Sequence, residues 1–258
     1  MAVTNHEWIV GRNPAAEALT AGRRRFFRLL VAAGVEEKGR LLETLSLAAE
    51  QKLPIQRVPR QQLDSLAKNH QGVALEASSY PYADLADIQA RAAELKQDLF
   101  VLLLDVIQDP QNLGTLLRTA EAVGVHGVLI PPQRAAGVTP AVVHSSAGAC
   151  EHMLVASLNL AQAITILKRD GAWVIGMENT PDARPVEEMP FDSALALVVG
   201  GEGEGLRALT RRNCDLLLRL PMSGKVGSLN AAVAGSVVLY MAYLARLRKA
   251  GQSAPHPT

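Results

Sequence analysis

The sequence contains little cysteine, no long apolar run and almost no net charge, and each shortage argues against a class of protein. Two cysteines, Cys150 and Cys214, cannot build the disulfide framework of a small secreted protein, so we expect a reducing cytoplasmic compartment. No run of about 20 apolar residues is present, and the N-terminus lacks the pattern of a signal peptide, so no membrane segment is expected. The 26 basic and 25 acidic side chains leave a net charge of +1, without the strong positive charge of many nucleic-acid-binding proteins.

Several catalytic motifs are also missing. The sequence has no G-x-S-x-G segment, which argues against a hydrolase triad. Its six histidines show no metal-ligand spacing, so no metal is expected. The glycines at 200–205 lack the G-x-G-x-x-G spacing of a dinucleotide site, which disfavours a nicotinamide-dependent dehydrogenase.

The 258 residues are 48% hydrophobic, enough for one large or two modest domains. A boundary is expected at 78–82, where serine, proline and tyrosine interrupt the pattern. Before it, Asn13 is expected to cap a helix that ends at Gly22. The other elements expected there are strands at 28–33, 55–58 and 73–77 and a helix at 39–52.

After the boundary, apolar strands alternate with helices, which predicts an α/β fold with a parallel sheet covered on both faces. Strands are expected at 99–105, 127–131, 172–177, 194–199 and 216–219. Helices are expected at 84–97, 113–123, 139–147, 160–170, 204–212 and 228 to about 248. The predicted organisation is a domain at 1–78, a linker at 79–97, a second domain at 98–250 and a frayed tail at 251–258.

Three loops follow expected strands, where parallel sheets bind ligands. In the first, Asn112 and Gly114 are expected at a turn, and Arg118 lies six residues after Asn112 on the following helix. A cation there would point back toward the loop. Taken alone, the same pattern also fits a helix cap and a surface arginine.

The second loop is the glycine-rich segment 200–205, where glycines allow a ligand to approach the backbone closely. Its carboxylates Glu202 and Glu204 would repel a pyrophosphate, which favours a neutral or cationic ligand. In the third loop, 220–235, Ser228 can cap the next helix, which places Asn230 in the first helical turn. Asn at that position is unfavourable unless its amide has a partner.

A short basic segment lies near the N-terminus. Its four arginines, with two phenylalanines between them, can contact nucleic-acid phosphates while the rings pack or stack. A solvated turn leading into a strand is the alternative interpretation. The arginines are Arg23, Arg24, Arg25 and Arg28.

Together the three loops resemble the signature motifs of the SpoU (TrmH) family of RNA 2′-O-ribose methyltransferases. The matching segments are N-x-G-x-x-x-R-T-A at 112–120, G-G-E-G-E-G at 200–205 and L-P-M with S-L-N between 220 and 230. The N-terminal part is similar to the small ribosomal-protein-like substrate-binding domain of one branch, which includes an enzyme that methylates a guanosine of 23S ribosomal RNA, and the chain looks most like that enzyme. Its recognisable stretches are 10–19 and 70–75.

The resemblance implies a deep trefoil knot in the C-terminal part of the sheet, a homodimer, and S-adenosylmethionine as methyl donor. The implied coenzyme-binding residues are Gly200, Leu220 and Leu229 through their backbone, completed by Ile130, Gly201, Met222 and Ser228. The implied polar active-site set is Asn112, Arg118, Glu202, Ser228 and Asn230. Gly227 departs from the family, which often has serine there, and this can loosen the loop.

The chemistry implied is an in-line methyl transfer to a ribose hydroxyl, a poor nucleophile. Alignment of the two reactants can supply about 7 kcal/mol or more of the acceleration. Arginine is always protonated in proteins, so Arg118 is assigned to holding an RNA phosphate or stabilising the developing alkoxide. The base stays open between that phosphate, a water and Glu202. The alternatives are the same chemistry on tRNA or another rRNA nucleotide, and a non-catalytic RNA-binding assembly factor.

Overall fold

A computed structural model describes residues 6–201, 203, 205–225 and 227–251. Contacts within the chain define two compact units. The first contains Met1–Pro81 together with Val138–His152, and the second contains Tyr82–Gly137 together with Met153–Thr258. The segment 138–152 was expected in the second domain, so the first unit includes a part of the chain that lies far from it in sequence.

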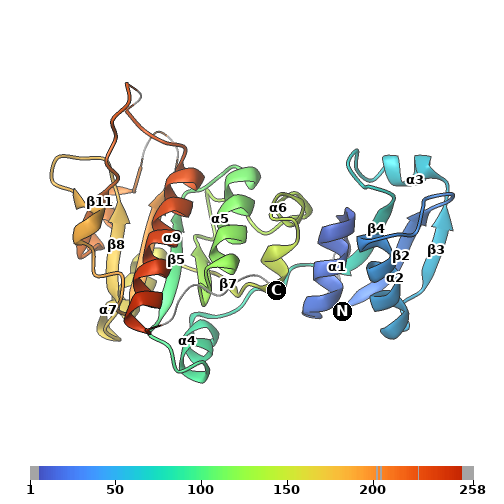
Figure 1. Cartoon of the computed structure of the whole chain (residues 1–258), viewed down its shortest axis with the longest axis horizontal. Coiled ribbons are helices and arrows are strands. Elements are labelled where there is room, and N and C mark those ends of the chain that lie inside the picture. The colour runs from blue at the N-terminus through green and yellow to red at the C-terminus, as the bar shows by residue number, and fades with distance from the viewer. Residues whose placement is uncertain (1–5, 202, 204, 226, 252–258) are drawn as a thin grey trace. The chain divides into compact units, whose positions relative to one another are not determined.

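The first unit is built on a four-stranded sheet in the order β1-β4-β2-β3 (Figure 1). β4 is antiparallel to both β1 and β2, and β3 is parallel to β2. Its elements are β1 (His6–Val10), α1 (Arg12–Ala21), β2 (Phe26–Ala32), α2 (Arg40–Glu50), β3 (Ile55–Val58), α3 (Arg60–Asp64), β4 (Val73–Ser78), α6 (Pro140–Ser145) and the 3-10 helix η1 (Ala149–His152).

Helix α1 begins differently from the expectation. Asn13 lies inside the helix and does not cap it, because α1 already begins at Arg12, after Gly11 with φ 104°. Gly22 ends α1 as predicted, in the left-handed conformation at φ 61°.

One face of the sheet packs against Leu63 of α3, through the buried residues Val10, Leu30, Ala32, Val58 and Ala74.

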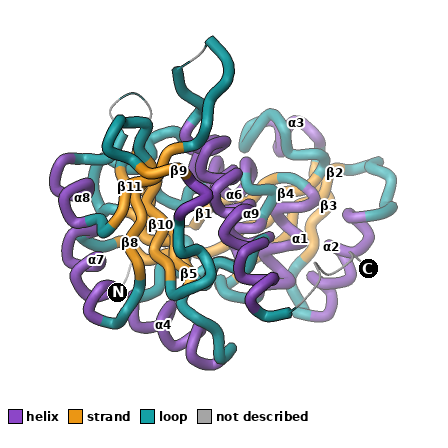
Figure 2. The backbone as a smooth tube through the Cα atoms, turned by 60° about the vertical axis from the view of Figure 1, so that its left-hand side comes forward, coloured by secondary structure: helices purple, strands orange, loops and turns teal. Residues whose placement is uncertain are grey.

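The second unit is a seven-stranded sheet in the order β7-β6-β5-β10-β8-β11-β9, and every strand pair in it is parallel. This confirms the predicted α/β class, with helices and strands distributed as in Figure 2. Its elements are α4 (Leu85–Glu94), β5 (Phe100–Asp105), α5 (Pro110–Ala122), β6 (Gly127–Ile130), β7 (Val155–Ser157), α7 (Leu160–Arg169), β8 (Trp173–Met177), β9 (Arg184–Pro185), the 3-10 helix η2 (Val186–Glu188), β10 (Leu195–Gly200), α8 (Ala208–Asn213), β11 (Leu216–Arg219) and α9 (Ala231–Lys249).

The strand order sets the position of the site. β10 lies between β5 and β8, although both precede it in the chain, and β11 lies between β8 and β9. Gly200 at the end of β10 is paired with Asp105 at the end of β5. Because the strands are parallel, the loops that follow β5, β8, β10 and β11 all leave the same edge of the sheet.

Helix α9 packs beside α5 at close range. A Cβ atom on Gly235 would lie 2.7 Å from Leu116 Cδ2, so a larger residue there would force the Leu116 side chain to move. The hydroxyl oxygens of Thr119 and Ser236 are 2.9 Å apart across the same contact. By length and hydropathy α9 could cross a membrane, but core helices of soluble proteins also meet that test, and α9 packs against α5 and β10.

His126 is a buried neutral group that makes stability depend on pH. Its Nδ1 accepts a hydrogen bond of 2.9 Å from the backbone N–H of Phe100. Burial, helped by the nearby cations Arg246 and Arg91, lowers the pKa of His126 from 6.5 to about 4. Protonation therefore opposes the folded state: the stabilisation is complete above pH 6.5 and is lost as the pH falls toward 4.

We predict that the free energy of unfolding falls between pH 6.5 and pH 4, and falls less in His126→Asn. Asparagine can still accept a hydrogen bond from the Phe100 N–H but cannot be protonated, so the stability of the variant is less sensitive to acid. At neutral pH the variant is less stable, because the smaller side chain fills less of the buried space. Denaturant titrations of both proteins across this range measure the difference. Parallel curves for the two proteins would contradict the assignment.

Candidate functional site

A cavity of about 530 Å³ lies at the ends of β8, β10 and β11. It brings together residues from the second and third signature loops, which are some 20 residues apart in the sequence. The site residues predicted from the sequence that line it are Gly200, Gly201, Leu220, Met222, Ser228, Leu229 and Asn230. The rest of the lining includes Met177 at the end of β8 and Glu178 and Asn179 directly after it.

The glycines at 200–205 allow the backbone to fold tightly against itself. A Cβ atom on Gly200 would lie 2.4 Å from the carbonyl carbon of Gly205, and one on Gly201 would lie 2.6 Å from the carbonyl oxygen of Val106. The N–H of Gly205 donates to the carbonyl of Gly201 at 3.2 Å. Side chains at Gly200 and Gly201 would open the loop, so this part of the cavity wall is made of backbone. Glu202 and Glu204 lie outside the described residues.

Asn230, and not Ser228, caps helix α9. Its side-chain oxygen accepts from the N–H groups of Ala232 at 2.9 Å and Val233 at 3.1 Å. This corrects the expectation of a cap at Ser228 and explains why asparagine is favourable here. Because the oxygen is committed to the helix, the amide nitrogen points outward, and it donates to Asn112 Oδ1 at 3.2 Å.

Asn112 reaches this contact from the first turn of α5. The helix begins at Pro110 and is capped by Asp109, whose carboxylate accepts from the N–H of Gln111. Asn112 and Gly114 were expected at a turn. Both lie within helix α5 instead. The Asn112–Asn230 hydrogen bond joins the first and third signature loops across 118 residues of sequence.

A second cavity, of about 720 Å³, adjoins the first. Gly201 and Gly205 line both cavities, while Asn112 lines the second and Asn230 the first. The glycine loop and the asparagine pair thus form a shared wall. Two neighbouring compartments with a common backbone wall suit a reaction that passes a group from one bound molecule to another.

Two acidic residues at this edge were not predicted from the sequence. Glu178 accepts from the N–H of Leu206 at 2.7 Å and so anchors the end of the glycine loop. The fully buried Asp105 accepts from Arg207 through its N–H at 2.9 Å and its Nε at 2.6 Å. Both follow or end parallel strands, which is the signal that could have identified them.

Arg118 and Ile130 are not brought into either cavity. Arg118 is exposed on α5, and Ile130 is 3% exposed in β6, which β5 separates from β10. Ile130 is not among the residues that line either cavity, and its role in coenzyme binding stays a prediction. Arg118 stands on the helix that carries Asn112, on a face open to a second molecule.

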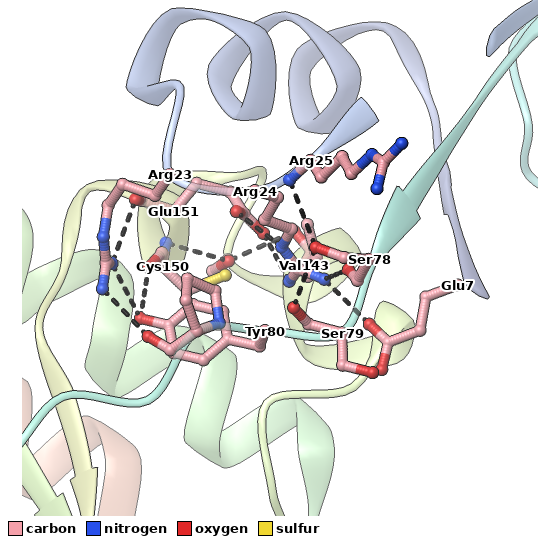
Figure 3. Close-up of polar contacts among 12 residues, drawn as sticks. Glu7, Arg23, Arg24, Arg25, Ser78, Ser79, Tyr80, Val143, Cys150 and Glu151 are labelled. Carbon is pink, nitrogen blue, oxygen red and sulfur yellow. Dashed lines mark hydrogen bonds and ion pairs between the residues drawn. The ribbon is translucent and has the colours of Figure 1, made fainter. Parts of the chain in front are cut away.

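The basic segment of the first unit divides into structural and surface residues (Figure 3). The prediction that Arg24 contacts RNA is wrong, because its side chain is 0% exposed and pairs with the buried Glu151 at 2.7 Å. Arg23 is half-buried and donates to Tyr80 Oη and to the carbonyl of Pro81. Arg25 is exposed, and Arg28 is 39% exposed and pairs with Glu76.

The two thiols are not nucleophiles at neutral pH. Burial raises the pKa of both Cys150 and Cys214 to about 12, so each stays protonated.

Comparison with known proteins identifies both parts of the chain. Residues 99–240 match the model of the SpoU rRNA methylase family, and residues 8–83 match that of the RNA 2′-O ribose methyltransferase substrate-binding domain. YacO of Bacillus subtilis, named as a TrmH family tRNA/rRNA methyltransferase, is 40% identical over 243 residues, 93% of this chain and 96% of YacO. A relative of the same description from Staphylococcus aureus strain COL is 42% identical over 92% of this chain and 96% of its own.

Solved structures share the fold. The SpoU methyltransferase AviRb of Streptomyces viridochromogenes, crystallised with its cofactor AdoMet, superposes with a TM-score of 0.78 at 24% identity, over 94% of this chain and 91% of AviRb. An AdoMet-bound rRNA methyltransferase from Sinorhizobium meliloti gives 0.76 at 21% identity, over 93% and 87%. The sequence matches establish the class: the chain belongs to the SpoU (TrmH) family of RNA methyltransferases, as the motifs predicted.

Proposed function

We propose that this protein transfers a methyl group from S-adenosylmethionine to a ribose 2′-hydroxyl of RNA, and that its target is a guanosine of 23S ribosomal RNA. The observation that carries the reaction is the meeting of the three signature loops around two adjoining cavities, joined by the hydrogen bond between Asn112 and Asn230. The target is supported by the match of residues 8–83 to the substrate-binding domain, which resembles that of the family branch that includes the methyltransferase of a 23S ribosomal RNA guanosine.

The first cavity fits S-adenosylmethionine. Its volume of about 530 Å³ lies in the usual range for small-molecule sites. Backbone at Gly200 and Gly201 and apolar side chains such as Leu220 and Met222 line it. When bound, the coenzyme supplies a methyl group activated on a positively charged sulfur. An apolar wall suits the loss of that charge during transfer, and the carboxylate of Glu178 adds a negative group to a pocket for a cation.

The second cavity is assigned to the acceptor nucleotide. Asn112 faces it with its amide oriented by Asn230, so a polar group stands fixed beside the shared wall. Arg118 supplies positive charge from the surface of α5, where it holds an RNA phosphate or stabilises the developing alkoxide. The proton leaves to that phosphate, to a water or to Glu202.

We further propose that the chain forms a homodimer through α9 and that its sheet carries the trefoil knot of the family. A knot is supported by the insertion of β10 between two earlier strands. The dimer is supported by an apolar stripe of exposed side chains on α9, which starts three residues after Asn230. Helix α9 packs against α5, the helix that carries Arg118. The members of the stripe are Val233 (49% exposed), Val237 (42%), Tyr240 (48%) and Leu244 (42%).

We predict that Tyr240→Arg converts the dimer to a monomer, because a charge in the middle of a buried apolar interface is strongly unfavourable. Size-exclusion chromatography with light scattering measures the mass. Leu209→Arg, at a 53% exposed position on α8, serves as the control and stays dimeric. A wild-type monomer, or a dimer that survives Tyr240→Arg, would refute the α9 interface.

The target is tested by mapping ribose methylation in RNA from cells with and without the gene. Loss of one 2′-O-methylguanosine from 23S ribosomal RNA is the expected result, and the purified protein should restore it. Loss of a modification from tRNA or another rRNA nucleotide would replace the proposed substrate. An unchanged RNA in both assays would favour a non-catalytic binding factor. A cytoplasmic location is part of the proposal.

A further inference from the structure

One face of the first unit's sheet ends in a group of aromatic and charged side chains. Trp8 of β1 and Arg28 of β2 both lie opposite Glu76 of the central strand β4, so the three share a cross-strand row. His6, one row further along β1, is directed to the same carboxylate. Phe27 lies at an irregularity in the β2–β4 pairing, next to Arg28.

These side chains hold one another in place. Glu76 binds His6 Nδ1 at 2.8 Å with one oxygen and Arg28 Nε at 2.6 Å with the other. The His6 ring stacks on Phe27 with centroids 4.0 Å apart and planes inclined by 17°. The guanidinium groups of Arg25 and Arg28 lie over the rings of Phe27 and Trp8, at 5.3 and 5.4 Å from their centroids.

The group packs against the core of the first unit on one side, and two of its side chains are partly exposed to solvent. Trp8 packs against the buried cluster beneath α3, which fixes the inner end of the row. His6 and Arg28 keep 41% and 39% of their side chains exposed, while the carboxylate that orients them is only 12% exposed. The stack therefore presents a partly exposed imidazole ring to solvent, and the guanidinium groups of Arg25 and Arg28 lie close to it.

We propose that this stack is a platform for unpaired RNA bases, an inference that rests on the proposed function. An RNA base continues the His6–Phe27 stack, and Arg25 binds the adjoining phosphate. Every base has a flat π-face, and stacking on aromatic side chains is how proteins hold single-stranded RNA. A duplex keeps its bases stacked inside and offers only its ends to such a platform. The substrate region captured by the first unit is therefore a single-stranded loop or bulge.

The test measures binding of full-length protein to a 12-nucleotide oligouridine over a series of salt concentrations. We expect His6→Ala and Phe27→Leu each to weaken binding about fivefold or more, with the salt dependence unchanged, because stacking is not electrostatic. Arg25→Ala should weaken binding and reduce the slope of log K against log salt by about 0.7, the release of one counterion from single-stranded RNA. Lys38→Ala and Leu42→Ala, exposed changes elsewhere in the unit, are the controls.

Two further probes make the result decisive. An abasic oligoribonucleotide of the same length should bind His6→Ala and wild type equally, and a 12-base-pair RNA duplex should bind more weakly than the single strand. Equal oligouridine binding by the variants and wild type, or preference for the duplex, would overturn the platform. Unfolding midpoints of the variants exclude misfolding as the cause. Methyl transfer by wild type to total RNA is assayed separately, so its absence would refute the proposed function without deciding the platform.

Discussion

Replacing Arg118 with alanine will lower the rate of methyl transfer by at least about 100-fold, the loss typical of removing one group that stabilises transition-state charge. Binding of S-adenosylmethionine will be unchanged, because Arg118 is exposed on α5 and lies outside the lining of the coenzyme cavity. The two effects separate if Arg118 acts on the RNA side of the reaction, as the proposed function assigns it. Single-turnover transfer from labelled coenzyme measures the first, and calorimetry with S-adenosylhomocysteine measures the second.

Two variants sharpen this experiment. Arg212→Ala removes an exposed arginine from α8 in the same unit and should keep the wild-type rate, so a general effect of charge is controlled. Arg118→Lys keeps the charge but not the planar fork of donors, and should recover only part of the rate. Near-wild-type turnover by Arg118→Ala would remove the residue from the active site.

The parallel sheet could be predicted because its strands are long apolar runs. Phe100–Asp105 and Leu195–Gly200 are buried along their whole length, and continuous burial writes a continuous apolar pattern into the sequence. β7 and β9, with three and two residues, are too short to leave such a pattern. β1 was missed for another reason, because its exposed end alternates charged and aromatic residues.

Most of the lining of the cavity that we assign to the coenzyme could be predicted from the sequence, whereas the contacts of the individual residues could not. Sequence order placed Gly200, Leu220 and Leu229 after strands, and the parallel sheet brought them together. Whether Ser228 or Asn230 caps α9 depends on a backbone shift of two residues, which propensity cannot resolve since both residue types cap helices well. Glu178 belongs to no motif, and its position directly after β8 is the signal in the sequence that could have identified it. Its contact with the N–H of Leu206 is known only from the folded chain.

The largest error concerned Arg24, and its physical cause leads to a second strong prediction. Four arginines within six residues suggested one solvent-facing patch, but Arg24 lies at a bend between α1 and β2, and its side chain is 0% exposed. Arg24 is directed inward and donates to both carboxylate oxygens of Glu151, at 2.9 and 2.7 Å (Figure 3). Burial opposes its charge, but the attraction of Glu151 and Glu7 outweighs burial and raises the pKa of Arg24.

Glu151→Ala will destabilise the first unit by about 3 kcal/mol or more, because it leaves a buried guanidinium without its main partner. The effect should largely disappear in the double variant Arg24→Met with Glu151→Leu, which fills the same space without charge. Glu36→Ala, which breaks the exposed pair with Lys38, should change stability by less than about 1 kcal/mol. In a Trp173→Phe background, Trp8 fluorescence reports unfolding of the first unit alone, since the chain contains two tryptophans.

This prediction also tests how the two units depend on each other along the chain. Glu151 lies within residues 99–240, the range that matches the methylase family, yet it folds with Met1–Pro81. The carbonyl of Cys150 accepts from Tyr80, and His152 pairs with Glu17, so the whole η1 turn is held by N-terminal residues. A fragment that begins after Pro81 would therefore expose Glu151 and Cys150, and it should be less soluble than the full chain. If the fragment is as soluble as the full chain, and if its residues are as stable against unfolding as they are in the full chain, then η1 does not need these partners.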